Sequence, residues 1–363
     1  MKKAVFIINS LQNGGAERVV VTQANYLQEK GVDVTVICLR RWIQYDIAST
    51  IHVIYLSNKQ QFSAFDYLTG VLWLIRSLNR VLERIFQDGD VILLTSNLLY
   101  PNLITRLSKY SKKALYVLHA HQDILSFSSS LPYKLFVRLL YRNRRIVCVG
   151  KSIADEMVNV YHLNKKMIKV VLNPINGRMI DRMRYEKNDF PHPYILFCGR
   201  LTAVKCPERM IRAFCKGEFY KKYFLVVLGI GELENKLKQM AEQYGVAEKV
   251  CFMGWEKNVY KWMEKAELLV LTSDSEGLSM TLIEALYCEC PVVSVRSRGP
   301  DQIMTGELER YLCSTSDDSV IRTMKDALSH YPGGLSGYTE RFSVDENTKT
   351  YLEIYREWDD TLK

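Results

Sequence analysis

The sequence predicts an α/β protein built from two doubly wound, Rossmann-like domains, and three observations lead to that fold class. The chain has 363 residues, more than one ordinary hydrophobic core holds, which suggests two domains of about 150 to 200 residues each. Short apolar runs alternate with segments of helical periodicity almost throughout the chain. Glycines and charged residues follow several of these runs, at the strand ends where open parallel sheets bind ligands.

The composition is that of an ordinary soluble protein, with 48% hydrophobic and 25% charged residues. No apolar run approaches the roughly 20 residues needed to span a bilayer. Residues 1–3 lead directly into a strand-like run and not into a signal peptide, so we expect a cytoplasmic protein. Nine cysteines occur without a C-x-x-C pair, so we expect them to be reduced and structural, and we expect no metal site.

The net charge of +9, from 49 basic and 40 acidic residues, indicates an anionic partner. The sequence has no helix-turn-helix, zinc-finger or RNA-binding signature, so we expect an anionic membrane surface and no nucleic acid. The most suggestive segment is residues 134–145, in which four basic residues share one face of an expected helix: Lys134, Arg138, Arg142 and Arg145. The solvated face of a helix that packs on a sheet explains the same pattern.

The N-terminal half begins with a buried strand at residues 4–8, and Gly14 and Gly15 then open a helix. Two glycines allow tight turning and close approach of the backbone to a ligand. A dinucleotide-binding domain begins in the same way, but its G-x-G-x-x-G fingerprint is missing, and Arg40 stands where that domain needs an acidic residue. Further strands of this half are expected at residues 32–39, 51–56, 91–95, 114–118 and 145–149.

Two histidines, His119 and His121, follow the expected strand at residues 114–118, the fifth of this half. The carboxyl end of a parallel strand is where ligands usually bind in open α/β sheets. There the imidazoles could donate hydrogen bonds to a ligand hydroxyl or act as acid or base near neutral pH. A partial metal site and plain polar strand ends are alternatives that the spacing leaves open.

The first domain is expected to close after an apolar run at residues 168–172. Residues 176–193 show little apolar periodicity and have two prolines near their end, which predicts a linker. We accordingly expect an N-terminal domain at residues 1–175, a C-terminal domain at residues 190–345 and a terminal helix at residues 346–363.

The second domain is expected to begin with a strand at residues 194–198, and the loop after it contains a glycine and two cations, Gly199, Arg200 and Lys205. A guanidinium and an ammonium in one strand-to-helix loop can together neutralise a pyrophosphate, although surface cations would give the same pattern. The next strand ends in a glycine turn through Gly229 and Gly231, a pair that is also common without a ligand. That strand is expected at residues 224–228, and the one after it at residues 250–254.

The stretch 274–286 follows an apolar strand at residues 268–272 and has the apolar spacing of a helix face. It predicts a turn with Glu276 in the loop and Glu284 about two turns into the helix. Backbone N–H groups at the start of such a helix are unpaired and lie at the positive end of the dipole, so they suit a phosphate. Glutamates near a helix start also complement the dipole or cap the backbone without any ligand. The N–H groups concerned belong to Ser279, Met280, Thr281 and Leu282.

Together these motifs resemble the retaining glycosyltransferase family 4, which has the GT-B fold of two Rossmann-like domains facing across a cleft. The run from Glu276-Gly277-Leu278 to Glu284-Ala285-Leu286 is similar to the family's signature of two glutamates separated by seven residues. Gly199 to Lys205 resembles its diphosphate-binding loop, Gly14-Gly15 its first loop and Gly229 to Gly231 its nucleotide loop. Asn173-Pro174 resembles the end of its N-terminal domain, and its last helix often crosses back to that domain.

The resemblance covers nearly all of the chain, with two departures. Cys288-Glu289-Cys290 stands where the family usually has a small residue and glycine. Residues 298–303 follow the family's glycine-acid loop only loosely, so no sugar contact is carried onto them.

The resemblance implies that the N-terminal domain binds an acceptor and that the C-terminal domain binds a nucleotide-diphosphate sugar, with a UDP-sugar as the expected donor. Arg200 and Lys205 would hold the diphosphate, Glu276 the hydroxyls of the donor sugar, and Glu284 the ribose. One histidine would contact the donor sugar; His121 fits the usual pattern, and His119 stays open. No metal or other cofactor is expected. The remaining expected donor contacts are Gly14, Gly15, Asn173, Gly199, Gly229, Gly231 and residues 279–282.

The expected reaction is transfer of a hexose, with retained configuration, to a glycan acceptor. A basic cytoplasmic protein suggests a lipid-linked acceptor at the inner face of the membrane, as in bacterial lipopolysaccharide, capsule or undecaprenyl-linked oligosaccharide assembly. A sugar-nucleotide epimerase or hydrolase of the same fold is the alternative. A non-catalytic binding protein is disfavoured because it would not need all of Arg200, Lys205, Glu276 and Glu284.

Overall fold

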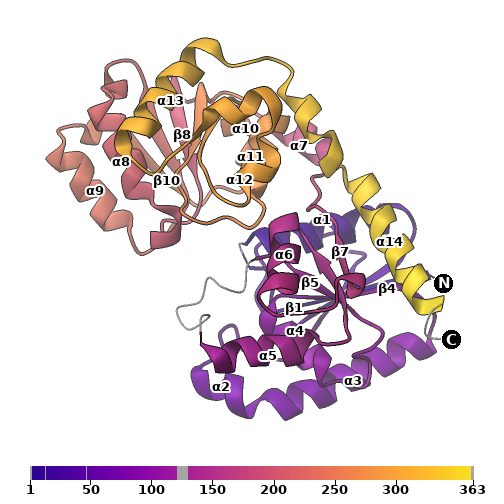
Figure 1. Cartoon of the computed structure of the whole chain (residues 1–363). Coiled ribbons are helices and arrows are strands. Elements are labelled where there is room, and N and C mark those ends of the chain that lie inside the picture. Colours follow the sequence, from indigo (N-terminus) through magenta and orange to yellow (C-terminus); the bar gives the residue numbers. More distant parts are fainter. Residues whose placement is uncertain (1, 13, 46, 121–129, 361–363) are drawn as a thin grey trace. The chain divides into compact units, whose positions relative to one another are not determined.

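The computed structural model describes residues 2–12, 14–45, 47–120 and 130–360 (Figure 1). The chain divides into two compact units. Unit 1 comprises Met1–Pro174 together with Phe342–Lys363, and unit 2 comprises Ile175–Arg341. Each unit contains a parallel sheet with helices packed on it, so each is described by itself below.

The sheet of unit 1 has the strand order β3-β2-β1-β4-β5-β6-β7, and the pairings between these strands are parallel. The inner strand β1 is fully buried from Ala4 to Ile8, as expected where helices cover both faces of a sheet. Continuous apolar runs are therefore the sequence signal for these strands. Their bounds are β1 Lys2–Ile8, β2 Asp33–Cys38, β3 His52–Tyr55, β4 Asp90–Asn97, β5 Leu115–Leu118, β6 Arg145–Cys148 and β7 Ile168–Val170.

The helices of unit 1 fall into two layers. Crossovers between parallel strands are right-handed. The connection from β1 to β2 runs in one direction along the sheet, and the connections after β3 run in the opposite direction. Their helices therefore lie on opposite faces of the sheet. Accordingly α1 packs on α14, whereas α3 contacts α4 and α4 contacts α5. The helices are α1 Gly15–Glu29, α2 Ala64–Thr69, α3 Val71–Gln87, α4 Leu99–Arg106, α5 Leu131–Tyr141, α6 Lys151–Asn159 and α14 Val344–Asp360.

The C-terminal helix α14 belongs to unit 1 through polar contacts with α1. Gln23 Nε2 donates a hydrogen bond of 2.7 Å to Asn347 Oδ1, and both side chains are buried. Tyr26 donates a second one, of 2.6 Å, to Asp345. A buried amide pair of this kind fixes the register of the two helices, because shifting either helix would leave its polar atoms unpaired.

The sheet of unit 2 has the order β10-β9-β8-β11-β12-β13 and is again parallel. Its strands are β8 Tyr194–Cys198, β9 Phe224–Leu228, β10 Val250–Gly254, β11 Leu268–Leu271, β12 Val292–Val295 and β13 Leu312–Cys313. Its helices are α7 Gly177–Arg184, α8 Pro207–Lys216, α9 Glu234–Gln243, α10 Tyr260–Met263, α11 Met280–Tyr287, α12 Pro300–Ile303 and α13 Asp317–His330.

Each sheet reverses its strand order at one place, between β1 and β4 in unit 1 and between β8 and β11 in unit 2. In open α/β sheets the connections diverge at such a point, and the crevice left at the carboxyl ends of the two strands is the usual ligand site. The topology alone therefore directs attention to the loops that follow β1, β4, β8 and β11.

Two sequence expectations are wrong at the level of local structure. The basic segment 134–145 is not one helix, because α5 ends at Tyr141 and Arg145 begins β6. Arg145 is buried, and its guanidinium donates to the carbonyl of Trp358, whose ring it also faces. Residues 176–193 are not a plain linker either, because they contain α7, which begins at the cap Asn176 and buries Ile180.

Candidate active site

The loop that follows β8 contains the two cations expected to bind a diphosphate. Arg200 is exposed, and its side chain makes no ion pair within the described residues. Lys205 ends a single 3₁₀ turn, Ala203–Lys205, and is half-buried. Arg200 is therefore free to meet a ligand, whereas Lys205 already has a partner.

The backbone around Gly229 and Gly231 packs directly against the backbone of this loop. Backbone hydrogen bonds join Gly199 N to Leu228 O at 2.9 Å and Leu201 N to Ile230 O at 3.0 Å. A Cβ atom on Gly229 would lie 1.9 Å from Gly199 O, and one on Gly231 would lie 2.3 Å from Leu201 O. Gly229 also has a φ of +138°, which L side chains rarely adopt. These two positions require glycine because two backbones pass each other without room for a side chain.

The loop that follows β11 brings Glu276 to Lys205. Lys205 Nζ lies 2.6 Å from Glu276 Oε1, and Ser273 Oγ donates to the same oxygen at 2.7 Å. The Glu276 side chain is only 10% exposed, so its charge is partly desolvated and is held by these two donors. The cation loop of β8 and the glutamate loop of β11 thus form one cluster at the switch point of unit 2.

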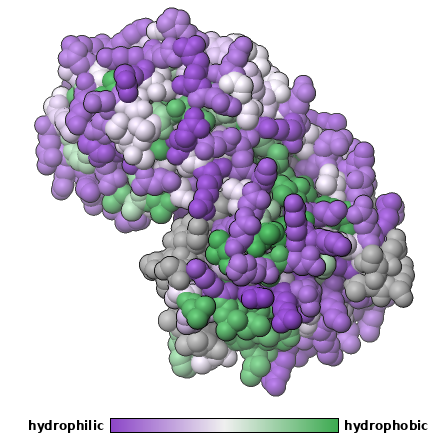
Figure 2. Space-filling model, viewed as in Figure 1, coloured by the Kyte–Doolittle hydropathy of each residue, from purple (hydrophilic) through white to green (hydrophobic). Residues whose placement is uncertain are grey.

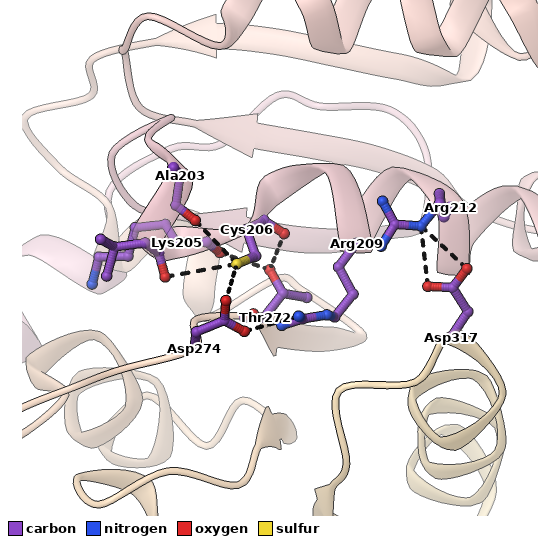
Figure 3. A network of polar contacts seen from close by, with 9 residues as sticks. Ala203, Lys205, Cys206, Arg209, Arg212, Thr272, Asp274 and Asp317 are labelled. Carbon is purple, nitrogen blue, oxygen red and sulfur yellow. Dashed lines mark hydrogen bonds and ion pairs between the residues drawn. The ribbon is translucent and has the colours of Figure 1, made fainter.

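Cys206 joins these two loops a second time (Figure 3). Its thiol has two acceptors within reach of its one proton, Ala203 O at 3.0 Å and Asp274 Oδ2 at 3.1 Å. The one hydroxyl proton of Thr272 is shared between Lys205 O, at 3.0 Å from Oγ1, and Cys206 O, at 2.9 Å. Burial and the hydrogen bond to Asp274 raise the pKa of the Cys206 thiol, so this group stays protonated and remains a donor.

Arg209, on the first turn of α8, completes the network. It donates to Thr272 O at 2.5 Å and to Asp274 Oδ1 at 2.8 Å. Burial alone would raise the pKa of Asp274, but the hydrogen bonds from Cys206 and Arg209 outweigh it and lower this pKa. Asp274 therefore stays ionised and ties the start of α8 to the glutamate loop.

Cys206 has a left-handed backbone, with φ +47° and ψ +48°, which predicts an ordered series of stabilities. We expect Cys206→Ala to lower the free energy of unfolding, because it removes the thiol hydrogen bond and keeps the strained backbone. Cys206→Gly loses the same bond but relieves the strain, so it should be about 1 kcal/mol more stable than Cys206→Ala. Urea unfolding of both variants measures the difference. An alanine variant as stable as the glycine variant would contradict this strain.

Glu284 differs from the sequence expectation. Helix α11 begins at Met280, so Glu284 lies about one turn into it and Leu278 precedes it. The Glu284 side chain is buried, and Tyr260 OH donates to its Oε1 at 3.3 Å. The helix start carries no side-chain cap from Ser279. The N–H groups of Met280, Thr281 and Leu282 lie in the first turn, which lacks intrahelical acceptors, beside the Glu276 loop.

The expected residues of unit 1 lie at the carboxyl ends of its strands. Gly14 follows β1, and Tyr45 OH bonds both its N–H, at 3.1 Å, and its carbonyl, at 2.9 Å. Gly15 is the first residue of α1. Asn173 follows β7 and is buried; its Oδ1 has no hydrogen-bond partner among the described residues. These groups leave polar atoms at the strand ends without forming a cluster like that of unit 2.

His119 follows β5 and contacts the end of β4, while His121 lies outside the described residues. His119 Nε2 is 3.0 Å from Asn97 Oδ1. Asn97 Nδ2 donates to Ile7 O and to Thr95, so Oδ1 is the acceptor and Nε2 must carry the imidazole proton. Burial lowers the pKa of His119 to about 4, so the ring is neutral at pH 7. Its buried Nδ1 has no partner in the described structure and can accept a hydrogen bond from a hydroxyl.

Sequence reasoning missed the residues that hold the cluster in place. Ser273, Cys206 and Asp274 have no motif that would single them out, although all three flank predicted site residues. Gly299 was also missed; a Cβ there would lie 2.8 Å from Gly277 O, so its loop closes against the Glu276 turn. Across residues 2–12, 14–45, 47–120 and 130–360, no group of three or more His, Cys, Asp or Glu side chains could hold a metal ion.

Both halves of the chain are similar to known proteins. Residues 13–177 match Glycosyltransferase Family 4, and residues 180–336 match Glycosyl transferases group 1. The chain is 27% identical over 317 residues, 85% of each chain, to N-acetylgalactosamine-N,N'-diacetylbacillosaminyl-diphospho-undecaprenol 4-alpha-N-acetylgalactosaminyltransferase of Campylobacter jejuni. It is 25% identical over 356 residues, 94% of this chain and 95% of the other, to the lipopolysaccharide core biosynthesis glycosyltransferase LpsD of Rhizobium meliloti.

Solved structures show the same fold. Anabaena Alr3699/HepE in complex with UDP superposes with a TM-score of 0.71 at 14% identity, covering 97% of this chain and 99% of that chain. The expected fold class, GT-B with two Rossmann-like parallel sheets, is therefore confirmed.

Proposed function

The chain belongs to glycosyltransferase family 4 and is a glycosyltransferase, and from that premise we propose that it moves a hexose from a UDP-sugar to a lipid-linked glycan with retention of configuration. The acceptor would be an intermediate of bacterial lipopolysaccharide or another cell-surface polysaccharide. The observation that carries the proposal is the cluster at the switch point of unit 2, where Lys205 pairs with Glu276 in the loop that leads to α11 and Arg200 belongs to the same loop as Lys205.

The cluster has the charge distribution that a nucleotide-diphosphate sugar requires. Arg200 offers a fork of donors, Lys205 a point charge, and the first turn of α11 unpaired amides, all suited to phosphate oxygens. Glu276 would accept hydrogen bonds from hydroxyls of the donor sugar. Glu284, which accepts a hydrogen bond from Tyr260, would accept others from the ribose hydroxyls. No metal ion would then be needed to neutralise the diphosphate.

The proposed reaction breaks the bond between the anomeric carbon and the diphosphate oxygen and forms a bond from the same carbon to an acceptor oxygen. The leaving phosphate takes the proton of the acceptor hydroxyl, and both events occur on one face of the sugar. Arg200, Lys205 and the α11 amides would stabilise the charge that grows on the diphosphate. His119, neutral and with an open acceptor at Nδ1, suits hydrogen bonding to a sugar hydroxyl better than proton transfer near pH 7. His121 keeps its proposed role at the donor sugar.

The acceptor class is supported by relatives. The Campylobacter jejuni relative is named for a diphospho-undecaprenol acceptor, and the Rhizobium meliloti relative for lipopolysaccharide core biosynthesis. Both match this chain over most of their own length. A lipid-linked acceptor would hold the enzyme at the cytoplasmic face of the membrane, although no described helix is long and apolar enough to cross a bilayer.

The test is nucleotide release from a panel of UDP-, GDP- and ADP-sugars, each with and without an extract of bacterial membrane lipids. Release from a UDP-sugar that depends on the lipid extract supports the proposal and identifies the donor. Donor conversion that is equally fast without lipid would contradict a lipid-linked acceptor and indicate a sugar-nucleotide epimerase or hydrolase.

A further inference from the structure

Exposed apolar side chains gather on one part of unit 1. Nine large apolar side chains of the described residues are at least half exposed, and seven of these lie on α2, α3, α5 or at the end of α4. Monomeric soluble proteins rarely expose such side chains together, so a concentration of them marks an interaction surface. The seven, which are between 51% and 79% exposed, are Phe65, Leu72, Trp73, Leu107, Leu131, Leu135 and Leu139.

These side chains are not the outer edge of the core. In α3 the core contacts come from Leu74, Leu78 and Leu82, which repeat every four residues on the opposite side from Leu72 and Trp73. In α5 the buried residues are Tyr133, Val137, Leu140 and Tyr141, whereas the exposed leucines form their own row at residues 131, 135 and 139. Helix α5 is thus apolar on two sides, and α3 is so in its first turn.

The two helices belong to one continuous layer. Helix α4 lies between them and contacts both. Arg106, in the last turn of α4, donates to Leu139 O, and the backbone N–H of Lys109 donates to the Asn79 side chain of α3. Leu107 therefore lies between α3 and α5. Figure 2 shows a hydrophobic area over α5 and beside α2, with hydrophilic side chains next to it. We call the outer surface of α2, α3, α4 and α5 the α3–α5 face.

Basic side chains surround the exposed leucines. On α3 they continue the row that begins at Leu72, at every fourth position, and on α5 they lie beside the leucine row. All are exposed, and none forms an ion pair within the described part of the chain. From residue 99 to residue 145 the sequence has nine basic residues and one acidic residue. The exposed arginines of the two helices are Arg76, Arg80, Arg84, Arg138 and Arg142.

A small cavity opens at the end of the α5 arginine row. Its volume is about 140 Å³, and it is lined by Arg138 and Arg142 together with His162 and Asn164. Two guanidinium groups and an amide around a hollow offer several donors to a phosphate-sized anion. The rest of its lining is Tyr141, Asn143, Ile146, Leu163 and Met167, so the cavity has a basic side next to an apolar one.

We propose that the α3–α5 face docks on an anionic lipid bilayer, with its leucines and Trp73 in the boundary of the acyl chains and its arginines on lipid phosphates. The occupant follows from charge: apart from Glu83 on α3 and Asp66 on α2, which pairs with Lys59, the charged side chains of these helices are basic. This excess of positive charge would repel a second copy of this chain, whereas an anionic headgroup layer complements it. The inference rests on the proposed function for its purpose, which is to bring the enzyme to a membrane-borne acceptor. It replaces the single basic stripe expected from sequence, since Arg145 is part of the core.

The experiment measures co-sedimentation of the full chain with vesicles of phosphatidylethanolamine and phosphatidylglycerol, and with vesicles of phosphatidylcholine. Each arginine near an anionic surface adds about fivefold to the partition coefficient, so the triple variant Arg76→Gln, Arg80→Gln, Arg138→Gln should bind anionic vesicles on the order of 100-fold more weakly. The triple variant Leu131→Ser, Leu135→Ser, Leu139→Ser should lose on the order of tenfold or more, and this loss should persist at high salt.

Matched controls change exposed residues of unit 2. Tyr244→Ser, Met253→Ser and Arg322→Gln remove comparable groups elsewhere and should leave partition unchanged, with melting curves checking that every variant folds. Equal loss in the control, equal binding of the parent to phosphatidylcholine vesicles, or a dimer that the leucine variant dissociates would each overturn the proposal. A protein that binds anionic vesicles but transfers no sugar refutes only the proposed function. One that transfers sugar to a detergent-dispersed acceptor but ignores vesicles refutes only the docking face.

Discussion

Replacing Arg200 by alanine is expected to lower kcat/KM for the nucleotide-sugar donor by roughly 100-fold, the size typical of losing one preorganised donor to a developing charge. Arg200 is exposed and has no ion pair within the described residues, so its removal should leave the free energy of unfolding unchanged. The reason is that its only assigned partner is the diphosphate. Steady-state nucleotide release, with donor concentration varied at saturating acceptor, measures the effect.

Lys205→Ala is expected to differ from Arg200→Ala in a diagnostic way. It removes a phosphate ligand and also the 2.6 Å partner of Glu276, whose side chain is nearly buried. An uncompensated carboxylate is costly, so this variant should lose both activity and stability. Arg322→Ala, on the exposed face of α13, is the matched control and should change neither. Near-normal donor kinetics in Arg200→Ala would remove the phosphate role from the β8 loop.

Much of the fold was accessible from the sequence because its strands are buried. The observed bounds of the buried strands β8 and β9 coincide with the apolar runs at residues 194–198 and 224–228. The edge strand β10, which is partly exposed, also has the expected bounds, residues 250–254. A parallel strand covered on both faces must be continuously apolar, and glycine turns or polar segments end it clearly. The order of the motifs also follows from the chain itself. The family and the GT-B fold could therefore be predicted, whereas the donor and acceptor stay proposals.

What the sequence did not predict depends on contacts between distant residues. Arg145 was assigned to an exposed face, but Trp358, 213 residues away, covers it. The pairing of Lys205 with Glu276 spans 71 residues and has no local signal. Glu284 was expected two turns into a helix that actually starts at Met280, because apolar spacing cannot distinguish a buried turn from a first helical turn. Helix periodicity reports local faces, while burial of a charge depends on tertiary packing.

Gly229→Ala is expected to be the most destabilising single-methyl change in the site, by roughly 3 kcal/mol or more. The added Cβ would lie 1.9 Å from Gly199 O, so one of the two backbones must move, and φ +138° adds strain. The loop that moves carries Arg200, so donor affinity should fall together with the free energy of unfolding. Urea unfolding and donor titration of one variant preparation measure both quantities.

Gly245→Ala separates the two causes. Gly245 also has a positive φ, of +68°, but no atom lies within 4 Å of its would-be Cβ. It should therefore cost only the left-handed backbone strain, about 1 to 2 kcal/mol, and leave donor binding unchanged. If Gly229→Ala cost no more than Gly245→Ala, the β8 loop would be able to shift without penalty. The close approach of Gly199 and Gly229 would then not be what positions Arg200. The bound nucleotide-sugar would instead have to position the Arg200 side chain.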